Sequence, residues 1–255
     1  MSLHPDAQQL IRRVEELSGR LVHATEEPDL KVMATISIAR GDTPAHFLRY
    51  RPGTRAVDYL VAHQLGFLVR QFSCPVGERW VVMSTAAEEQ AGIEAMGLGG
   101  HPPDYARTME ARIVTQLRTY AVGIRVDDWI WKNLPDLRDQ QEHSILSQLA
   151  ENARSLAPEF RHKFPKPLVD ANTTMNAAYA VTWGDVLQES RFTIPFKALG
   201  YGGKAAELLA IVRETPDDPR ADRSLIERWA AIGFDLSAEY AEACRLHGNR
   251  QSDAG

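Results

Sequence analysis

Apolar side chains recur at intervals of three or four residues through most of this 255-residue chain. That spacing places them along one face of an α-helix, whereas a half-buried strand would show strict alternation. The pattern therefore predicts a chain built mainly of amphipathic helices. The predicted helices cover residues 5–22, 55–72, 103–120, 137–156, 171–188, 204–213, 224–232 and 237–246, and a further one begins near Thr85.

Extended structure is predicted at two short segments near the N-terminus and at one later segment. Residues 33–39 and 46–51 are rich in β-forming side chains, and the turn signal GDTP at residues 41–44 separates them. We expect these two segments to pair as a hairpin, and we expect Thr54 to cap the helix that follows. Residues 192–196 are expected to form a short strand or extended segment.

These elements predict an α+β fold that is predominantly helical, with a small N-terminal β-sheet packed on the 55–72 helix and a helical C-terminal half. A chain of this length forms one large domain or two small ones. Residues 158–170 contain three prolines and are the best candidate for a linker. We therefore divide the chain into an α+β region at 1–157 and a helical region at 158–255 packed on it, with a single domain as the alternative.

Charge and cysteine content narrow the class of protein. The formal net charge is -5 and the sequence pI is about 5.9, so nucleic acid is not an expected partner. Cys74 and Cys244 lie far apart, which favours free thiols in a reducing compartment. The N-terminus has no secretory signal, and the uncharged stretch 171–184 is shorter than the about 20 residues that cross a bilayer. We expect a soluble, cytoplasmic chain with no membrane partner.

The 55–72 helix carries part of a metal-binding pattern. Zinc peptidases use His-Glu-x-x-His, in which two histidines four residues apart bind one metal and the glutamate activates a bound water. His63 occupies the first histidine position. Gln64 stands where the glutamate would be, and Phe67 stands where the second histidine would be. Both of the chemically decisive positions therefore differ from the pattern.

The segment Ala62-His63-Gln64-Leu65-Gly66-Phe67 resembles the Ala-His-Glu-Leu-Gly-His helix of ImmA/IrrE-type zincin metallopeptidases. The preceding short strands suit that fold, and the resemblance covers about residues 30–72. It implies a degenerate zincin-like region in a protein of bacterial stress responses or mobile elements. It does not carry over activity, because the catalytic glutamate and the second histidine are replaced.

A zinc site at His63 would need ligands from elsewhere in the chain. One imidazole does not hold zinc, because zinc sites use three or four protein ligands. Phe67 supplies no lone pair, and Gln64 cannot accept a proton as a carboxylate does. Without a metal, His63 is a partly buried histidine on a core-facing surface of the helix, and no cofactor is expected. The candidate further ligands are His46, His101 and His143, with Glu88, Glu89 and Glu142 as carboxylates.

Three functions remain open at this point. The favoured one is a non-catalytic, degenerate metallopeptidase-like protein with a binding or regulatory role, whose partner is another protein. The second is a metal-dependent hydrolase with a non-standard ligand set around His63. The third is a helical protein-interaction module unrelated to zincins, which would have no sheet beside the 55–72 helix. Trp129 and Trp131 are expected to be core residues or, if exposed, to mark a partner surface.

Overall fold

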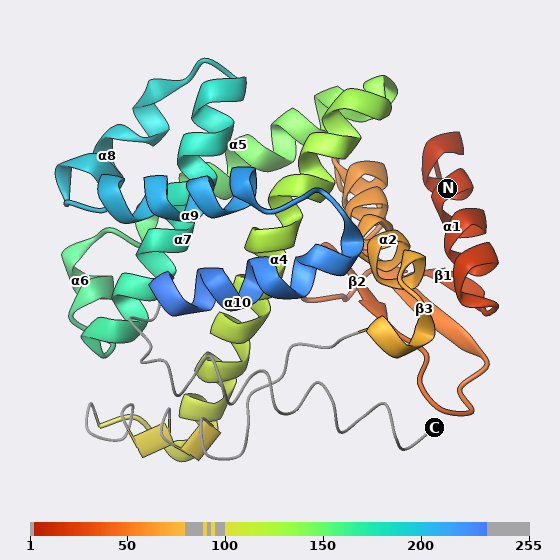
Figure 1. Cartoon of the computed structure of the whole chain (residues 1–255), viewed down its shortest axis with the longest axis horizontal. Coiled ribbons are helices and arrows are strands. Elements are labelled where there is room, and N and C mark those ends of the chain that lie inside the picture. The colour runs from red at the N-terminus through yellow and green to blue at the C-terminus, as the bar shows by residue number, and fades with distance from the viewer. Residues whose placement is uncertain (1–2, 80–88, 91–92, 95–99, 234–255) are drawn as a thin grey trace. The chain divides into compact units, whose positions relative to one another are not determined.

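The computed structural model describes residues 3–79, 89–90, 93–94 and 100–233 (Figure 1). Helices predominate among these residues, and three strands near the N-terminus form a small sheet. The predicted α+β, predominantly helical fold with a helical C-terminal half is therefore confirmed. The predicted helices near Thr85 and at 237–246 lie outside the described residues, as does Cys244.

The chain forms two compact units, and each unit is built from separate stretches of the sequence. Of the described residues, 3–79 and 125–147 make up the first unit, and 89–90, 93–94, 100–124 and 148–233 make up the second. The chain passes from one unit to the other inside α4 (Pro103–Asn133) and again inside α5 (Arg138–Arg154). The boundary placed by sequence between residues 157 and 158 falls within the second unit.

The first unit opens with α1 (Pro5–Ser18), which is shorter than predicted. Gly19 ends this helix in the left-handed conformation, with a φ of 69°, and its N–H bonds to the carbonyl of Glu15. The residues after this glycine form β1 (Leu21–Glu26), a strand that was not predicted. Leu21 continues the apolar spacing of the helix, so a prediction from periodicity alone placed the end of the helix too far along the chain.

The three strands form a mixed sheet in the order β1-β3-β2 (Figure 1). β3 (Ala45–Tyr50) pairs in parallel with β1 and antiparallel with β2 (Ala34–Ser37), so the predicted hairpin pairing is confirmed. Side chains along β3 alternate between exposed Phe47 and Arg49 and buried neighbours. On the buried side, the ring of His46 contacts a phenylalanine of the following helix. The sheet therefore places one face on the core.

The helix after the sheet, α2 (Val57–Ser73), carries the His63 motif. α1 and the sheet both pack against it. A Cβ atom at Gly66 would lie 2.5 Å from Cγ1 of Val126, so the glycine allows α4 to approach this helix closely. The predicted cap at Thr54 is wrong, because the N-cap residue is Ala56, and the hydroxyl of Thr54 donates to the carbonyl of Arg51. Two 3-10 turns, η1 (Val76–Glu78) and η2 (Pro135–Leu137), complete the described first unit.

The described residues of the second unit form helices joined by turns, and no strand occurs among them. Its central element is α7, which is buried over most of its length and contacts α9 and α10. Trp229 of α10 is fully buried and its indole N–H donates to the carbonyl of Leu208 in α9 at 2.9 Å. After α4 and α5, the elements are α6 (Pro158–Arg161), α7 (Lys166–Val186), η3 (Ser190–Phe192), α8 (Ile194–Ala198), α9 (Gly202–Glu214), η4 (Pro219–Ala221) and α10 (Asp222–Gly233).

Two sequence expectations in this unit need correction. Residues 192–196 are not extended, since they belong to η3 and α8, and Pro195 sits in the first turn of α8 where its missing N–H is tolerated. The proline-containing segment 158–170 forms α6 and the start of α7, which also begin beside prolines. The uncharged stretch 171–184 lies inside the buried helix α7. Among the helices of the described residues, none is both long and apolar enough to cross a membrane.

Candidate functional site

His63 lies against a buried carboxylate within the first unit. Its Nε2 atom is 3.4 Å from Oδ1 of Asp127, which belongs to the C-terminal part of α4. The side chain of Asp127 is 2% exposed and that of His63 is 18% exposed. The hydroxyl of Tyr59, one turn before His63, donates to the same Oδ1 atom at 2.7 Å. The three side chains form a polar group, the His63 group, that links α2 to α4.

Aromatic rings flank His63 along its own helix. The ring of Phe67 meets the imidazole edge to face, with 5.0 Å between centroids and an interplanar angle of 89°. The ring of Tyr59 lies on the other side at 5.9 Å. Residues four apart on a helix are neighbours on one face, so Phe67 is placed where the second histidine of a zinc helix would be. Its phenyl ring offers carbon and no ligand atom.

Two glutamines of α5 hold the surroundings of the His63 group in place. Gln141 is fully buried, and its amide donates to the backbone carbonyl of Asp127 at 2.8 Å. The side-chain oxygen of Gln140 accepts hydrogen bonds from the backbone N–H groups of Asp58 and Tyr59, at 3.0 and 3.2 Å. Gln140 therefore supplies from another helix the N-terminal cap that α2 lacks in its own sequence.

Replacing Gln140 with alanine is expected to lower the free energy of unfolding by about 1–2 kcal/mol, the usual cost of losing a helix cap. Two backbone N–H groups at the start of α2 would lose their acceptor. Urea denaturation followed by circular dichroism measures the change. Asp139→Ala is the matched control, because Asp139 is the exposed neighbour in the same turn and has no hydrogen bond within the described part of the chain. An equal loss in both variants would contradict the capping role.

The structure assigns His46 to the core of the first unit. Its side chain is fully buried, and Nδ1 accepts a hydrogen bond from the backbone N–H of Ala39 at 3.1 Å. Burial lowers the pKa of this imidazole, and the positive charge of Arg20 lowers it further. Nε2 has no hydrogen-bond partner among the residues that the structure describes. His46 is thus a core histidine whose environment favours the neutral imidazole. Its ring packs against that of Phe72, with 5.1 Å between ring centroids.

The other two candidate ligands have different surroundings. His101 belongs to the second unit, where its ring stacks on Tyr105 and Phe164 and one ring nitrogen bonds to the carbonyl of Lys163 at 2.7 Å. His143 is an exposed residue of α5. Within the described ranges, neither they nor His46 forms a three-ligand cluster with His63. Of the carboxylates considered, Glu89 pairs with Arg107, Glu142 is exposed, and Glu88 lies outside the described residues.

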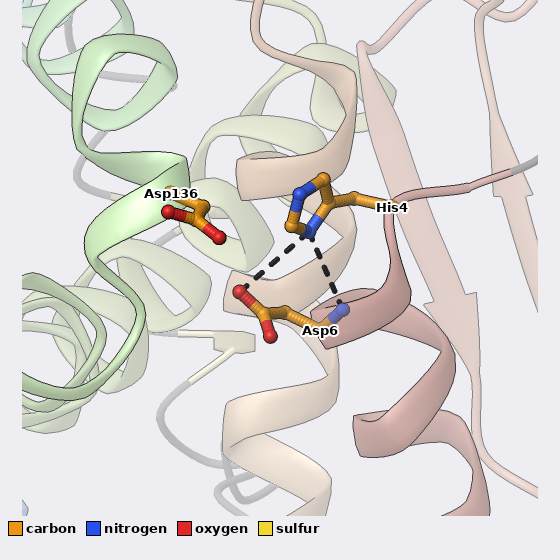
Figure 2. A group of neighbouring side chains, drawn as sticks. All are labelled: His4, Asp6 and Asp136. Atoms are coloured by element: carbon orange, nitrogen blue, oxygen red, sulfur yellow. Dashed lines mark hydrogen bonds and ion pairs between the residues drawn. The ribbon is translucent and has the colours of Figure 1, made fainter.

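One group of three possible metal ligands does occur in the described residues, at the start of α1. Figure 2 shows His4, Asp6 and Asp136, whose ligand atoms lie within 4.8 Å of one another. Nδ1 of His4 already accepts a hydrogen bond from the backbone N–H of Asp6 at 3.3 Å and lies 3.6 Å from its carboxylate. The imidazole of His4 therefore acts as the cap of α1, and Asp136 is an exposed acid beside it, so the cluster carries no metal assignment.

The His63 group does not supply a ligand set for zinc. Tetrahedral zinc holds nitrogen and oxygen ligands at about 2.0–2.1 Å, so neighbouring ligand atoms lie about 3.3 Å apart. The 3.4 Å between His63 and Asp127 matches that spacing. These are two ligands where a catalytic site needs three, and Phe67 takes the place of the third. The residues present therefore do not fit a catalytic zinc ion, although two of them have its spacing.

Comparisons of this chain with protein-family models, with curated proteins and with solved structures found no significant match. The geometry of the His63 group therefore carries the functional assignment.

Proposed function

We propose that this chain is a non-catalytic, degenerate metallopeptidase-like protein that acts by binding another protein in a regulatory role. The observation that carries the proposal is that His63 contacts the ring of Phe67, with 5.0 Å between ring centroids, and also lies 3.4 Å from the carboxylate of Asp127. The helix thus carries a phenyl ring at the position where a zinc helix has its second histidine ligand. A small sheet beside the helix of the motif is consistent with this proposal.

The chemistry of the motif supports a role without hydrolysis. Gln64 has an amide where a zinc peptidase has its general base, and an amide does not take up a proton from water at neutral pH. Asp127 is engaged with Tyr59 and lies beside His63, so the pair joins two helices of the first unit. These interactions favour a role for His63 and Asp127 in stabilising the fold.

A binding role is supported by exposed apolar side chains on the first unit. Phe47 lies on the exposed side of β3, and its ring contacts that of His23 on β1 at 5.7 Å. Trp129 of α4 is 43% exposed, so the expectation that it is a core residue is wrong, whereas Trp131 is half-buried. Large exposed aromatic groups are enriched at protein–protein interfaces. The partner class we propose is therefore another protein.

Metal analysis of the purified chain tests the non-catalytic assignment. Elemental analysis after dialysis against zinc is expected to find far less than one zinc per chain, and His63→Ala is expected to leave that value unchanged. His143→Ala, which removes an exposed histidine of the same unit, is the matched control for adventitious binding. One zinc per chain that is lost in His63→Ala but kept in His143→Ala would refute the assignment and favour the hydrolase with a non-standard ligand set.

A further inference from the structure

The second unit contains a cavity that the His63 group does not involve. Its volume is about 710 Å³, which lies within the range of about 300–1,000 Å³ for small-molecule sites. The lining residues come from the N-terminal part of α4, the end of α5, residues 158–164 (α6 and the turn after it, here the α6 segment) and α7, and all of them belong to this unit. The size and the concave shape fit an organic ligand of modest size.

One wall of the cavity is aromatic. Tyr105, Phe160 and Phe164 line it. The rings of Tyr105 and Phe164 are nearly parallel, with an angle of 13° and 6.3 Å between centroids, and the ring of His101 lies parallel to Phe164 at 5.6 Å. These rings already stack on one another, and a further flat ring would extend the stack on an outer face of the group. The wall therefore favours a ligand that contains a planar ring.

Amide side chains form a second part of the lining, and they are held in position by one another. Asn176 is 3% exposed, its oxygen accepts a hydrogen bond from Gln116 at 2.9 Å, and its nitrogen donates to the hydroxyl of Ser155. These two bonds use half of the four hydrogen bonds that an asparagine side chain can make.

The amide of Asn172, one turn earlier on α7, lines the same cavity and has no hydrogen bond to any described residue. The hydrogen-bonding groups of Asn172 and Asn176 that bond to no described residue include both donors and acceptors. A heterocyclic base edge presents donors and acceptors in the same way, so the two amides are complementary to such an edge.

The charge of the lining is positive although the chain as a whole is acidic. Arg112, Arg154 and Lys163 line the cavity, against the single acid Glu151. None of the three cations forms an ion pair within the ranges that the structure describes. Arginine side chains bind phosphate oxygens in pairs of parallel hydrogen bonds, and lysine adds a point charge. Three cations suit a phosphate better than a single carboxylate.

We propose that this cavity binds a mononucleotide. The base stacks on the aromatic wall, its edge bonds to Asn172 and Asn176, and its phosphate binds the cations contributed by α4, α5 and the α6 segment. The proposal goes beyond the assignment of the His63 group, and the two share no residue.

Isothermal titration calorimetry of the full chain with AMP, GMP, CMP and UMP tests the proposal, with inorganic phosphate and benzoate as the phosphate-only and ring-carboxylate probes. At least one nucleotide is expected to bind at one per chain in the micromolar range, about tenfold or more tightly than either probe. The proposal is overturned if no nucleotide binds more tightly than millimolar, or if phosphate or benzoate binds as tightly as the best nucleotide.

Matched variants locate the binding to this cavity. Arg154→Gln and Asn172→Leu are each expected to weaken binding of the best nucleotide by about tenfold or more. Arg213→Gln removes the same charge from the exposed face of α9, outside the lining, and is expected to leave the affinity unchanged. Arg154 is exposed, so its variant is expected to fold, which circular dichroism checks. Equal weakening in Arg154→Gln and Arg213→Gln, or no weakening in Arg154→Gln, would overturn the proposal.

Discussion

Phe67→His is expected to convert the His63 group into a zinc site that binds one metal ion per chain. The new imidazole would lie one turn after His63 on the same face of α2, and Asp127 would complete a set of three ligands. The existing 3.4 Å between His63 and Asp127 already has the spacing of two zinc ligands. Elemental analysis measures the metal content, and zinc at about a hundred times its dissociation constant would stabilise the fold by about 2.7 kcal/mol.

The control for this gain is Val69→His, which adds a histidine to the same helix two residues further on, a position that turns away from His63. It is expected to bind no zinc beyond the unmodified chain. The combined change Phe67→His and His63→Ala is expected to lose the gain. If Phe67→His binds no zinc while it remains folded, then α2 and α4 do not have the geometry of a metal site, and the degenerate-zincin assignment fails with them.

The fold was predictable from the sequence where an element is long enough to show its period. The helices α2, α5 and α7 each bury one face or more over many residues, so their apolar spacing identifies them. β1 was missed because Leu21 continues the spacing of α1, and the stop at Gly19 depends on a left-handed conformation that periodicity does not register. The five-residue helix α8 is too short to show a helical period, so residues 192–196 were predicted as extended, although a proline is tolerated in the first turn of a helix.

The candidate site was predictable only where it lies within one helix. His63, Gln64 and Phe67 follow from their spacing, and their positions relative to a zinc motif need no tertiary information. Asp127 lies on another element, and the packing of α4 against α2 brings it to His63. A signal was present in the sequence, because Asp127 is three residues from both Ile124 and Ile130, which are buried. A carboxylate on an apolar stripe requires a polar partner, and that requirement points to a site.

Asp127→Ala is expected to lower the free energy of unfolding by about 2–3 kcal/mol, because the carboxylate is buried and bonds across two helices. Hydrogen bonds to charged groups contribute about 1.5–3 kcal/mol each, and Tyr59 loses one at 2.7 Å. Asp128→Ala is the matched control, since this neighbouring acid is half exposed and pairs with Lys132 on the surface. Such surface pairs contribute less than about 1 kcal/mol. Urea denaturation measures both values.

A double-mutant cycle separates the hydrogen bond from the loss of side-chain volume. Tyr59→Phe removes only the hydroxyl, and in combination with Asp127→Ala it is expected to cost less than the sum of the two single changes, since both remove the same bond. Full additivity would show that the bond between Tyr59 and Asp127 does not stabilise the first unit.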